Sequence, residues 1–140
     1  MPRPSELPIP LQSRVVSELG AADREVVART GSLRERVALE QHFGSSVWGE
    51  LLQNPDLTAP EVARIAQHAT LPKPLLEAIV ANDTWLGRPE VRHALLANPA
   101  VDGATLDRVV HALPLGECLQ VAQSRAFRQK VRQAAKQRLK

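Results

Sequence analysis

Aromatic residues are scarce in this chain, and cysteine is almost absent. Tyr does not occur, Phe and Trp make up 3% of the 140 residues, and Cys118 is the single cysteine. One cysteine excludes an intrachain disulfide. The core has to be built mainly from Leu, Val and Ala, and we expect Cys118 to be a small buried side chain of an amphipathic helix rather than a reactive thiol.

Long apolar runs and targeting signals are also missing. No apolar run approaches the length that a membrane-spanning helix needs. The N-terminal residues do not combine a charged start, an apolar stretch and a small-residue cleavage site. These absences predict a soluble cytoplasmic protein that is not a transmembrane protein.

The motifs that carry catalysis, cofactors or metals do not occur. The sequence contains no GxSxG, no glycine-rich phosphate loop, no HExxH and no CxxC. The four histidines, His42, His68, His93 and His111, never fall three or four residues apart. We therefore expect no catalytic residue, no cofactor and no metal. An enzyme or metal protein whose site is assembled from distant residues stays open as the weakest hypothesis.

Helix-forming residues dominate what is present. Ala, Leu, Arg, Gln and Glu are abundant, and no segment shows the alternation typical of a strand. Ser32 and Glu35 have the spacing of a capping box, which predicts a helix that ends at Gly44. Pro89 is placed to open another helix, after a break over residues 83–87. These signals predict an all-α fold of short helices.

One segment of the chain repeats after 44 residues. Residues 47–55, VWGELLQNP, align with residues 91–99, VRHALLANP. The match continues into a second apolar helix, where Thr58 aligns with Asp102 as an N-cap. Each copy predicts a helix that ends at Asn54 or Asn98, a turn, a cap and a second helix. Such pairs must stack, because a single pair cannot bury its own apolar face.

These two copies carry a family resemblance. The stretches ELLQNPDLTAPEVARIA and RHALLANPAVDGATLDRVV resemble bacterial HEAT-like repeats of the leucine-rich-variant kind, over residues 46–124. The resemblance implies a right-handed α-solenoid-like stack of short antiparallel helix pairs, with a binding or scaffolding role and no shared catalytic residue. We expect a proline-rich arm over residues 1–10 and a single helical-repeat domain over 11–140, with its clearest repeats at 46–66 and 90–110.

Charge is distributed unevenly along the chain. All 15 acidic residues and 11 of the 18 basic residues lie in 1–124, whereas 125–140 holds the other seven basic residues and no acid. Four of these cations recur at spacings of three and four and form a stripe: Arg125, Arg128, Arg132 and Lys136. We expect a basic capping helix over 125–140, with Phe127 and Val131 buried and the stripe in solvent. Whether the stripe binds an anionic partner or only complements the acidic body stays open.

Trp48 and Arg92 occupy the same position in the two copies. Because a buried arginine needs a partner, this position is expected to be partly exposed, and Trp48 to be more exposed than Leu51 or Leu95. Both residues are then candidates for partner binding, since tryptophan is a favoured interface anchor. In the alternative, Trp48 lies flat against the next repeat and Arg92 extends its stem over a similar surface.

The expected function is a non-enzymatic protein-interaction or scaffold module whose protein partner the sequence does not identify. The alternative is a nucleic-acid-binding helical-repeat protein, or one that binds another anionic surface, acting through the basic C-terminal helix. Apart from Phe127, which is expected to be buried, no aromatic residue is interleaved with the basic ones there, as it is on many nucleic-acid-binding surfaces.

Overall fold

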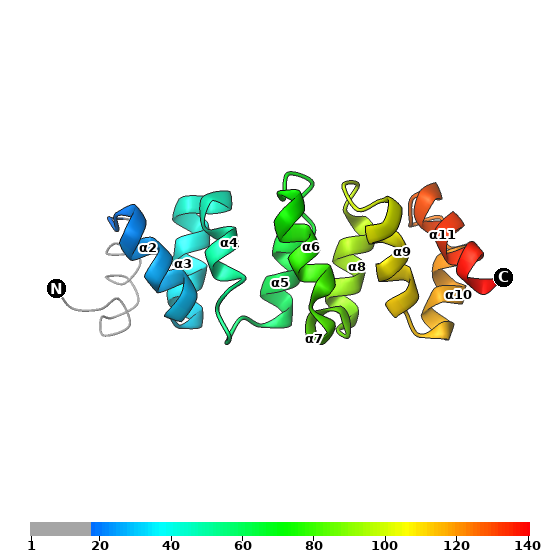
Figure 1. The fold of residues 1–140 in the computed structure, drawn as a ribbon, viewed down its shortest axis with the longest axis horizontal. Coiled ribbons are helices and arrows are strands. Elements are labelled where there is room, and N and C mark those ends of the chain that lie inside the picture. Colours follow the sequence, from blue (N-terminus) through cyan, green and yellow to red (C-terminus); the bar gives the residue numbers. More distant parts are fainter. Residues whose placement is uncertain (1–17) are drawn as a thin grey trace. The chain divides into compact units, whose positions relative to one another are not determined.

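The computed structural model describes residues 18–140, so the expected proline-rich arm over residues 1–10 lies outside the described residues. The described part is helical and contains no strand, which confirms the all-α class (Figure 1). The described residues divide into two compact units, and the boundary between the units falls between Thr58 and Ala59. The single domain over 11–140 and the right-handed stack stay predictions.

The first unit contains three α-helices and a 3₁₀ turn in its described part: α2 (Ala21–Thr30), α3 (Leu33–Phe43), η2 (Gly44–Val47) and α4 (Trp48–Leu51). Helix α2 packs against α3 and α4. The predicted capping box is confirmed, because the Ser32 hydroxyl accepts a hydrogen bond from the Glu35 N–H and the Glu35 carboxylate accepts one from the Ser32 N–H. Gly44 ends α3 with φ 56°, a left-handed conformation that favours glycine.

The second unit is built from seven helices: α5 (Ala59–Ala66), α6 (Lys73–Ala81), α7 (Asp83–Leu86), α8 (Pro89–Ala97), α9 (Gly103–Ala112), α10 (Leu115–Gln123) and α11 (Gln129–Leu139). Helix α5 packs on α8, α6 on α9, α9 on α11 and α10 on α11 (Figure 1). Two expectations are corrected. The break predicted over 83–87 contains α7, because Asn82 caps a helical turn there. The last helix begins at Gln129 rather than at residue 125.

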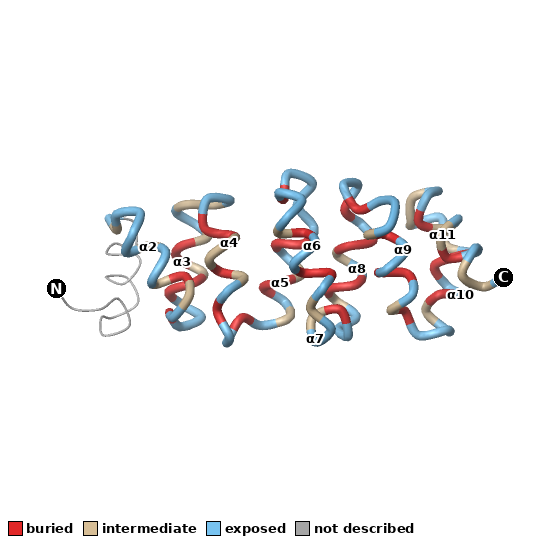
Figure 2. Tube along the Cα trace, in the orientation of Figure 1, coloured by how far each residue is buried: buried red, intermediate tan, exposed pale blue. Residues whose placement is uncertain are grey.

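The core of the second unit is aliphatic, as the composition predicts. Figure 2 shows buried and exposed stretches alternating along the helices of this unit, as expected when one side of each helix faces the core. The fully buried side chains include Val62, Ile65, Ile79, Leu95 and Val109. Cys118 is buried too, and its thiol lies 3.7 Å from the Ala135 carbonyl oxygen, which agrees with its expected role as a small core residue.

Two buried asparagines perform the same task, one in each unit. The Asn54 amide Nδ2 donates to the carbonyls of Ala28 and Gly31 at the end of α2, at 3.0 and 3.1 Å. Its Oδ1 accepts the N–H of Asp56 at 2.8 Å. A helix leaves its last carbonyls without intrahelical partners, and a side chain that both donates and accepts satisfies them while it closes the next turn.

Asn98 repeats this pattern in the second unit. Its Nδ2 donates to the carbonyls of Ala66 and His68 at 2.7 and 2.9 Å, and its Oδ1 accepts the Ala100 N–H at 2.8 Å. Asn98 caps α8 as predicted, whereas α4 ends at Leu51 and reaches Asn54 through a turn. The asparagine therefore does more than end a helix, because it also ties that helix to an earlier one.

Both predicted N-cap residues directly precede a helix. Thr58 directly precedes α5, at the predicted position. Asp102 occupies the N-cap position of α9, but its carboxylate makes no capping hydrogen bond, so that part of the prediction is wrong. The chain enters α9 through Gly103 at φ 53°, which is not a helical conformation, so the first N–H groups are not arranged for a regular cap.

Candidate functional site

Trp48 and Arg92 are both buried, which corrects the expectation that they are exposed. Trp48 is 4% exposed, close to the 2% of Leu51 and the 0% of Leu95, and this burial removes it as a candidate contact. Arg92 is also 4% exposed. The guanidinium of Arg92 donates to both oxygens of Glu117, at 2.9 and 3.2 Å, and to the Leu86 carbonyl. The sequence argument failed because the carboxylate that neutralises Arg92 comes from a later helix.

The predicted basic stripe separates into structural and exposed cations. Arg128 donates to the carbonyls of Asn98 and Val101, at 2.8 and 3.1 Å, so it is not a free solvent-facing charge. Arg125 and Lys136 are exposed as predicted, and Arg132 is half-buried. The difference arises because the turn before α11 places Arg128 over the connection between α8 and α9, where it binds the carbonyl of the α8 C-cap Asn98 and that of Val101.

The apolar side of α11 is confirmed in part. Val131 is fully buried. Phe127 is only half-buried, because it lies in the turn before α11 and packs edge-on against His93, with ring centroids 6.1 Å apart and an interplanar angle of 74°. We therefore expect Phe127 to contribute less to stability than a core phenylalanine.

Replacing Arg128 with Gln is expected to lower the free energy of unfolding by about 1–2 kcal/mol, since it removes two charge-assisted hydrogen bonds to carbonyls of the α8–α9 connection. Arg125→Gln is the matched control and should change it by less than about 0.5 kcal/mol, because Arg125 is exposed and forms no ion pair with a described residue. Urea unfolding followed by circular dichroism measures both. Equal values for the two variants would show that the Arg128 contacts do not stabilise the fold.

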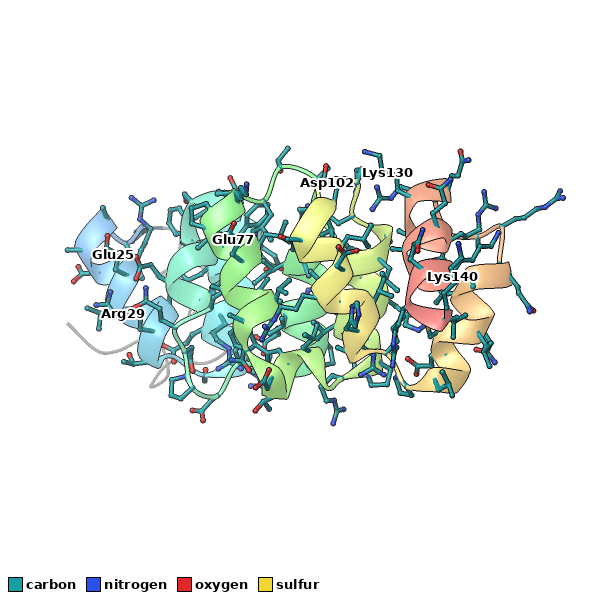
Figure 3. The ribbon with its side chains drawn as sticks, turned by 45° about the vertical axis from the view of Figure 1, so that its right-hand side comes forward. Glu25, Arg29, Glu77, Asp102, Lys130 and Lys140 are labelled. Carbon is teal, nitrogen blue, oxygen red and sulfur yellow. The ribbon has the colours of Figure 1, made fainter. Side chains whose placement is uncertain are left out.

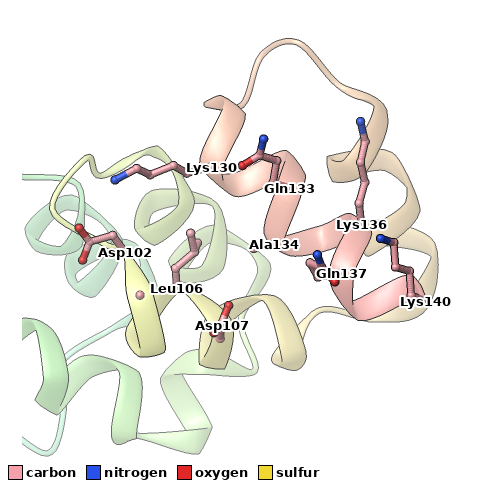
Figure 4. Close-up of a pocket in the computed structure, with 10 residues that line it drawn as sticks. Asp102, Leu106, Asp107, Lys130, Gln133, Ala134, Lys136, Gln137 and Lys140 are labelled. Carbon is pink, nitrogen blue, oxygen red and sulfur yellow. The ribbon is translucent and has the colours of Figure 1, made fainter.

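An open groove of about 830 Å³ runs between α9 and α11 (Figure 4). The α9 wall carries two carboxylates, Asp102 and Asp107, and the α11 wall carries three ammonium groups, Lys130, Lys136 and Lys140. Leu106 and Ala134 supply apolar surface, and Gln133 and Gln137 supply carboxamides. Figure 3 shows Asp102, Lys130 and Lys140 at this end of the described chain.

The charged side chains of the two groove walls do not form ion pairs with each other. No ion pair within 4 Å joins Asp102 or Asp107 to a described lysine, although several other ion pairs form in the second unit. Both walls therefore present charge that a bound segment can reach. The arrangement suits a ligand that carries both charge signs and some apolar surface.

A second, smaller hollow of about 420 Å³ lies between α10 and α11. Arg125, Arg132 and Lys136 line it together with the carboxamides of Gln123, Gln129 and Gln133, and no acidic residue lines it. This basic hollow brings together three of the four stripe cations that the sequence predicted. Its chemistry suits an anionic group.

The described residues meet neither the requirements of a metal site nor those of a membrane-spanning helix. Within 18–140, no group of three or more His, Cys, Asp or Glu side chains is placed to hold a metal ion. None of the helices described there is long and apolar enough to cross a membrane.

Away from both hollows, the pKa of Glu90 lies below its ordinary value. The main cause is a backbone N–H at the start of α8 that binds its carboxylate, and Arg88 adds to the effect.

Sequence reasoning missed the groove. Lys130, Gln133, Gln137 and Lys140 recur at helical spacing, so a stripe on that side of α11 could have been read from the sequence. The facing wall could not have been read from the sequence, because nothing local indicates that α9 is the helix beside α11.

Comparison with known proteins adds no relative, since no protein-family model, no curated protein and no solved structure matches the chain.

Proposed function

We propose that this chain is a non-enzymatic protein-binding module that holds a segment of a partner protein in the groove between α9 and α11. The observation that carries the proposal is the pair of oppositely charged groove walls without an ion pair between them. Complementary charges across an interface select partners and fix their register. A partner segment with acidic residues toward α11 and basic residues toward α9 would complement both walls.

The groove suits a polypeptide better than a nucleic acid. Asp102 and Asp107 would repel phosphates along one wall, whereas Leu106 and Ala134 offer apolar contact. The carboxamides of Gln133 and Gln137 donate and accept hydrogen bonds, as a peptide backbone requires. The wall from Lys130 to Lys140 is about 15 Å long at the helical rise, which accommodates about five extended residues.

We further propose that the helices form HEAT-like pairs of one repeating type. The hydrogen bonds of Asn54 and Asn98 support this, because each asparagine binds two carbonyls near the end of an earlier helix and the N–H of the residue two positions later. A repeat whose turn also anchors the preceding pair gives rigid helices with side-by-side grooves.

The basic hollow between α10 and α11 favours a second candidate function, binding of nucleic acid. Arg125, Arg132 and Lys136 surround it without an acid, and phosphate contacts of this kind give affinity that falls steeply with salt. The two candidate functions depend on different residues, so variants of those residues distinguish them in one experiment.

The test places a photo-crosslinking amino acid at Ala134 and exposes the full chain to cell extract. Protein capture is expected to fall about tenfold in the Lys130→Glu, Lys140→Glu double variant, since two rim charges are reversed. Lys73→Glu on α6 is the matched control, because Lys73 is an exposed lysine outside the groove. Capture that is equal in all three proteins would contradict the groove.

A labelled single-stranded oligonucleotide supplies the second arm of this test. Tight binding that weakens with salt and is lost in the Arg125→Gln, Arg132→Gln variant, without protein capture at Ala134, would replace the protein-binding proposal with the nucleic-acid one.

A further inference from the structure

Helix α10 exposes two leucines on one face. Leu115 is 62% exposed and Leu119 is 46% exposed, and the four-residue spacing places them on the same side of the helix. Gln123 continues this row by one more turn and lines the basic hollow beside Arg125 and Arg132. We call Leu115 and Leu119 the leucine face of α10. This face lies next to the basic hollow, whose Arg125 and Arg132 form no ion pair with a described residue.

Helix α2 in the first unit carries the opposite pattern. Val26 is 51% exposed, and the exposed Asp23 and Glu25 flank it. Neither carboxylate forms an ion pair with a described residue. The two arginines of α2 do not neutralise this face, because Arg24 lies over the Phe43 ring, at 4.3 Å from its centroid, and Arg29 pairs with Glu50 at 2.9 Å. Figure 3 shows Glu25 projecting from α2.

We propose that the chain associates head to tail, with the acidic face of α2 in one copy docked on the leucine face of α10 in another. Val26 would cover Leu115 and Leu119, while Asp23 and Glu25 would lie near Arg125 and Arg132 of the basic hollow. Both partners of this contact are surfaces of the same chain, and their apolar and charged parts are complementary. The contact lies outside the α9–α11 groove and does not depend on the proposed function.

A contact between two different faces leaves one free face at each end of every assembly. Such a heterologous contact continues into longer assemblies unless the rotation between copies closes a ring. The surfaces involved are small, so the contact is expected to be weak and dependent on concentration. Its charged part should also weaken with salt.

Sedimentation velocity over about a hundredfold range of concentration tests the association of the full chain. The average mass is expected to rise with concentration and to pass that of a dimer, and the rise should shrink when salt increases from about 0.05 M to about 0.5 M. A mass that stays at one chain throughout would overturn the proposal, and it would leave the groove proposal standing.

Two variants each remove one face. Val26→Gln and Leu119→Gln change exposed side chains, so both should melt like the natural protein, and each alone should stay monomeric. Mixed together, they still offer one intact α2 face and one intact α10 face, so they should form a one-to-one dimer and nothing larger. Leu33→Gln is the matched control, because Leu33 has the same 51% exposure as Val26 and lies outside both faces. Association of either variant alone, or no dimer on mixing, would refute the head-to-tail contact.

Discussion

Asn98→Ala is expected to lower the free energy of unfolding by about 3 kcal/mol, the largest loss among the substitutions considered. The Asn98 side chain makes three hydrogen bonds at 2.7–2.9 Å from a position that is 0% exposed. Each lost bond costs about 1 kcal/mol, and the carbonyls of Ala66 and His68 lose their side-chain donor. Asn98→Asp should be at least as damaging, because a carboxylate would face those two carbonyl oxygens.

Asn82 provides the matched control for this prediction. Its Oδ1 accepts the Trp85 N–H at the start of α7, and its amide nitrogen forms no hydrogen bond with a described residue. Asn82→Ala should therefore cost only about 1 kcal/mol, the usual value of an N-cap. Urea unfolding followed by circular dichroism measures both variants. If Asn98→Ala costs no more than Asn82→Ala, the amide of Asn98 does not tie α8 to α5.

Glu117→Ala is expected to lower the free energy of unfolding by about 2–3 kcal/mol. The substitution leaves the Arg92 guanidinium, which is 4% exposed, without its carboxylate. Removing one partner of a fully buried pair costs roughly 3–5 kcal/mol, and the figure is lower here because the Glu117 side chain is 30% exposed. Glu117 also lies in the first turn of α10, where a negative charge is favourable.

The exposed pair of Arg108 and Asp83 is the control for this second prediction. Its atoms lie 3.4 Å apart, and the side chains are 53% and 92% exposed. Asp83→Ala should change the free energy of unfolding by less than about 0.5 kcal/mol, since exposed ion pairs contribute little. Thermal melting compares the two variants directly. A Glu117→Ala protein that melts like Asp83→Ala would show that Arg92 finds water or another partner when the carboxylate is gone.

Several helix boundaries could be predicted because their signals act within one helical turn. The Ser32 and Glu35 box, the glycine stop at Gly44 and the proline start at Pro89 all lie where the local pattern predicts them. The start of α11 was placed too early, because residues 125–127 carry apolar and basic residues at helical spacing but form a turn. Periodicity alone does not distinguish a first helical turn from a turn that packs on a neighbouring helix.

The roles of the candidate site residues were harder to predict. The sequence identified Arg125, Arg128, Arg132 and Lys136 as one stripe, and three of them do line the basic hollow. Arg128 does not line the hollow, because it binds carbonyls 27 and 30 residues earlier in the chain. Trp48 and Arg92 were placed at the surface by an argument about one position, although the partner of Arg92 lies 25 residues later.

The sequence by itself therefore determined the helical class, several helix boundaries, the repeated Asn-Pro turn and the separation of positive charge into the last 16 residues, since composition and hydrogen bonds over a few positions decide these features. The tertiary structure alone decided which charges are buried and which are free, and that α9 lies beside α11 to form a groove with oppositely charged walls. The physical reason is that burial and pairing depend on groups brought together from distant helices, and no local pattern along the chain records which helices meet.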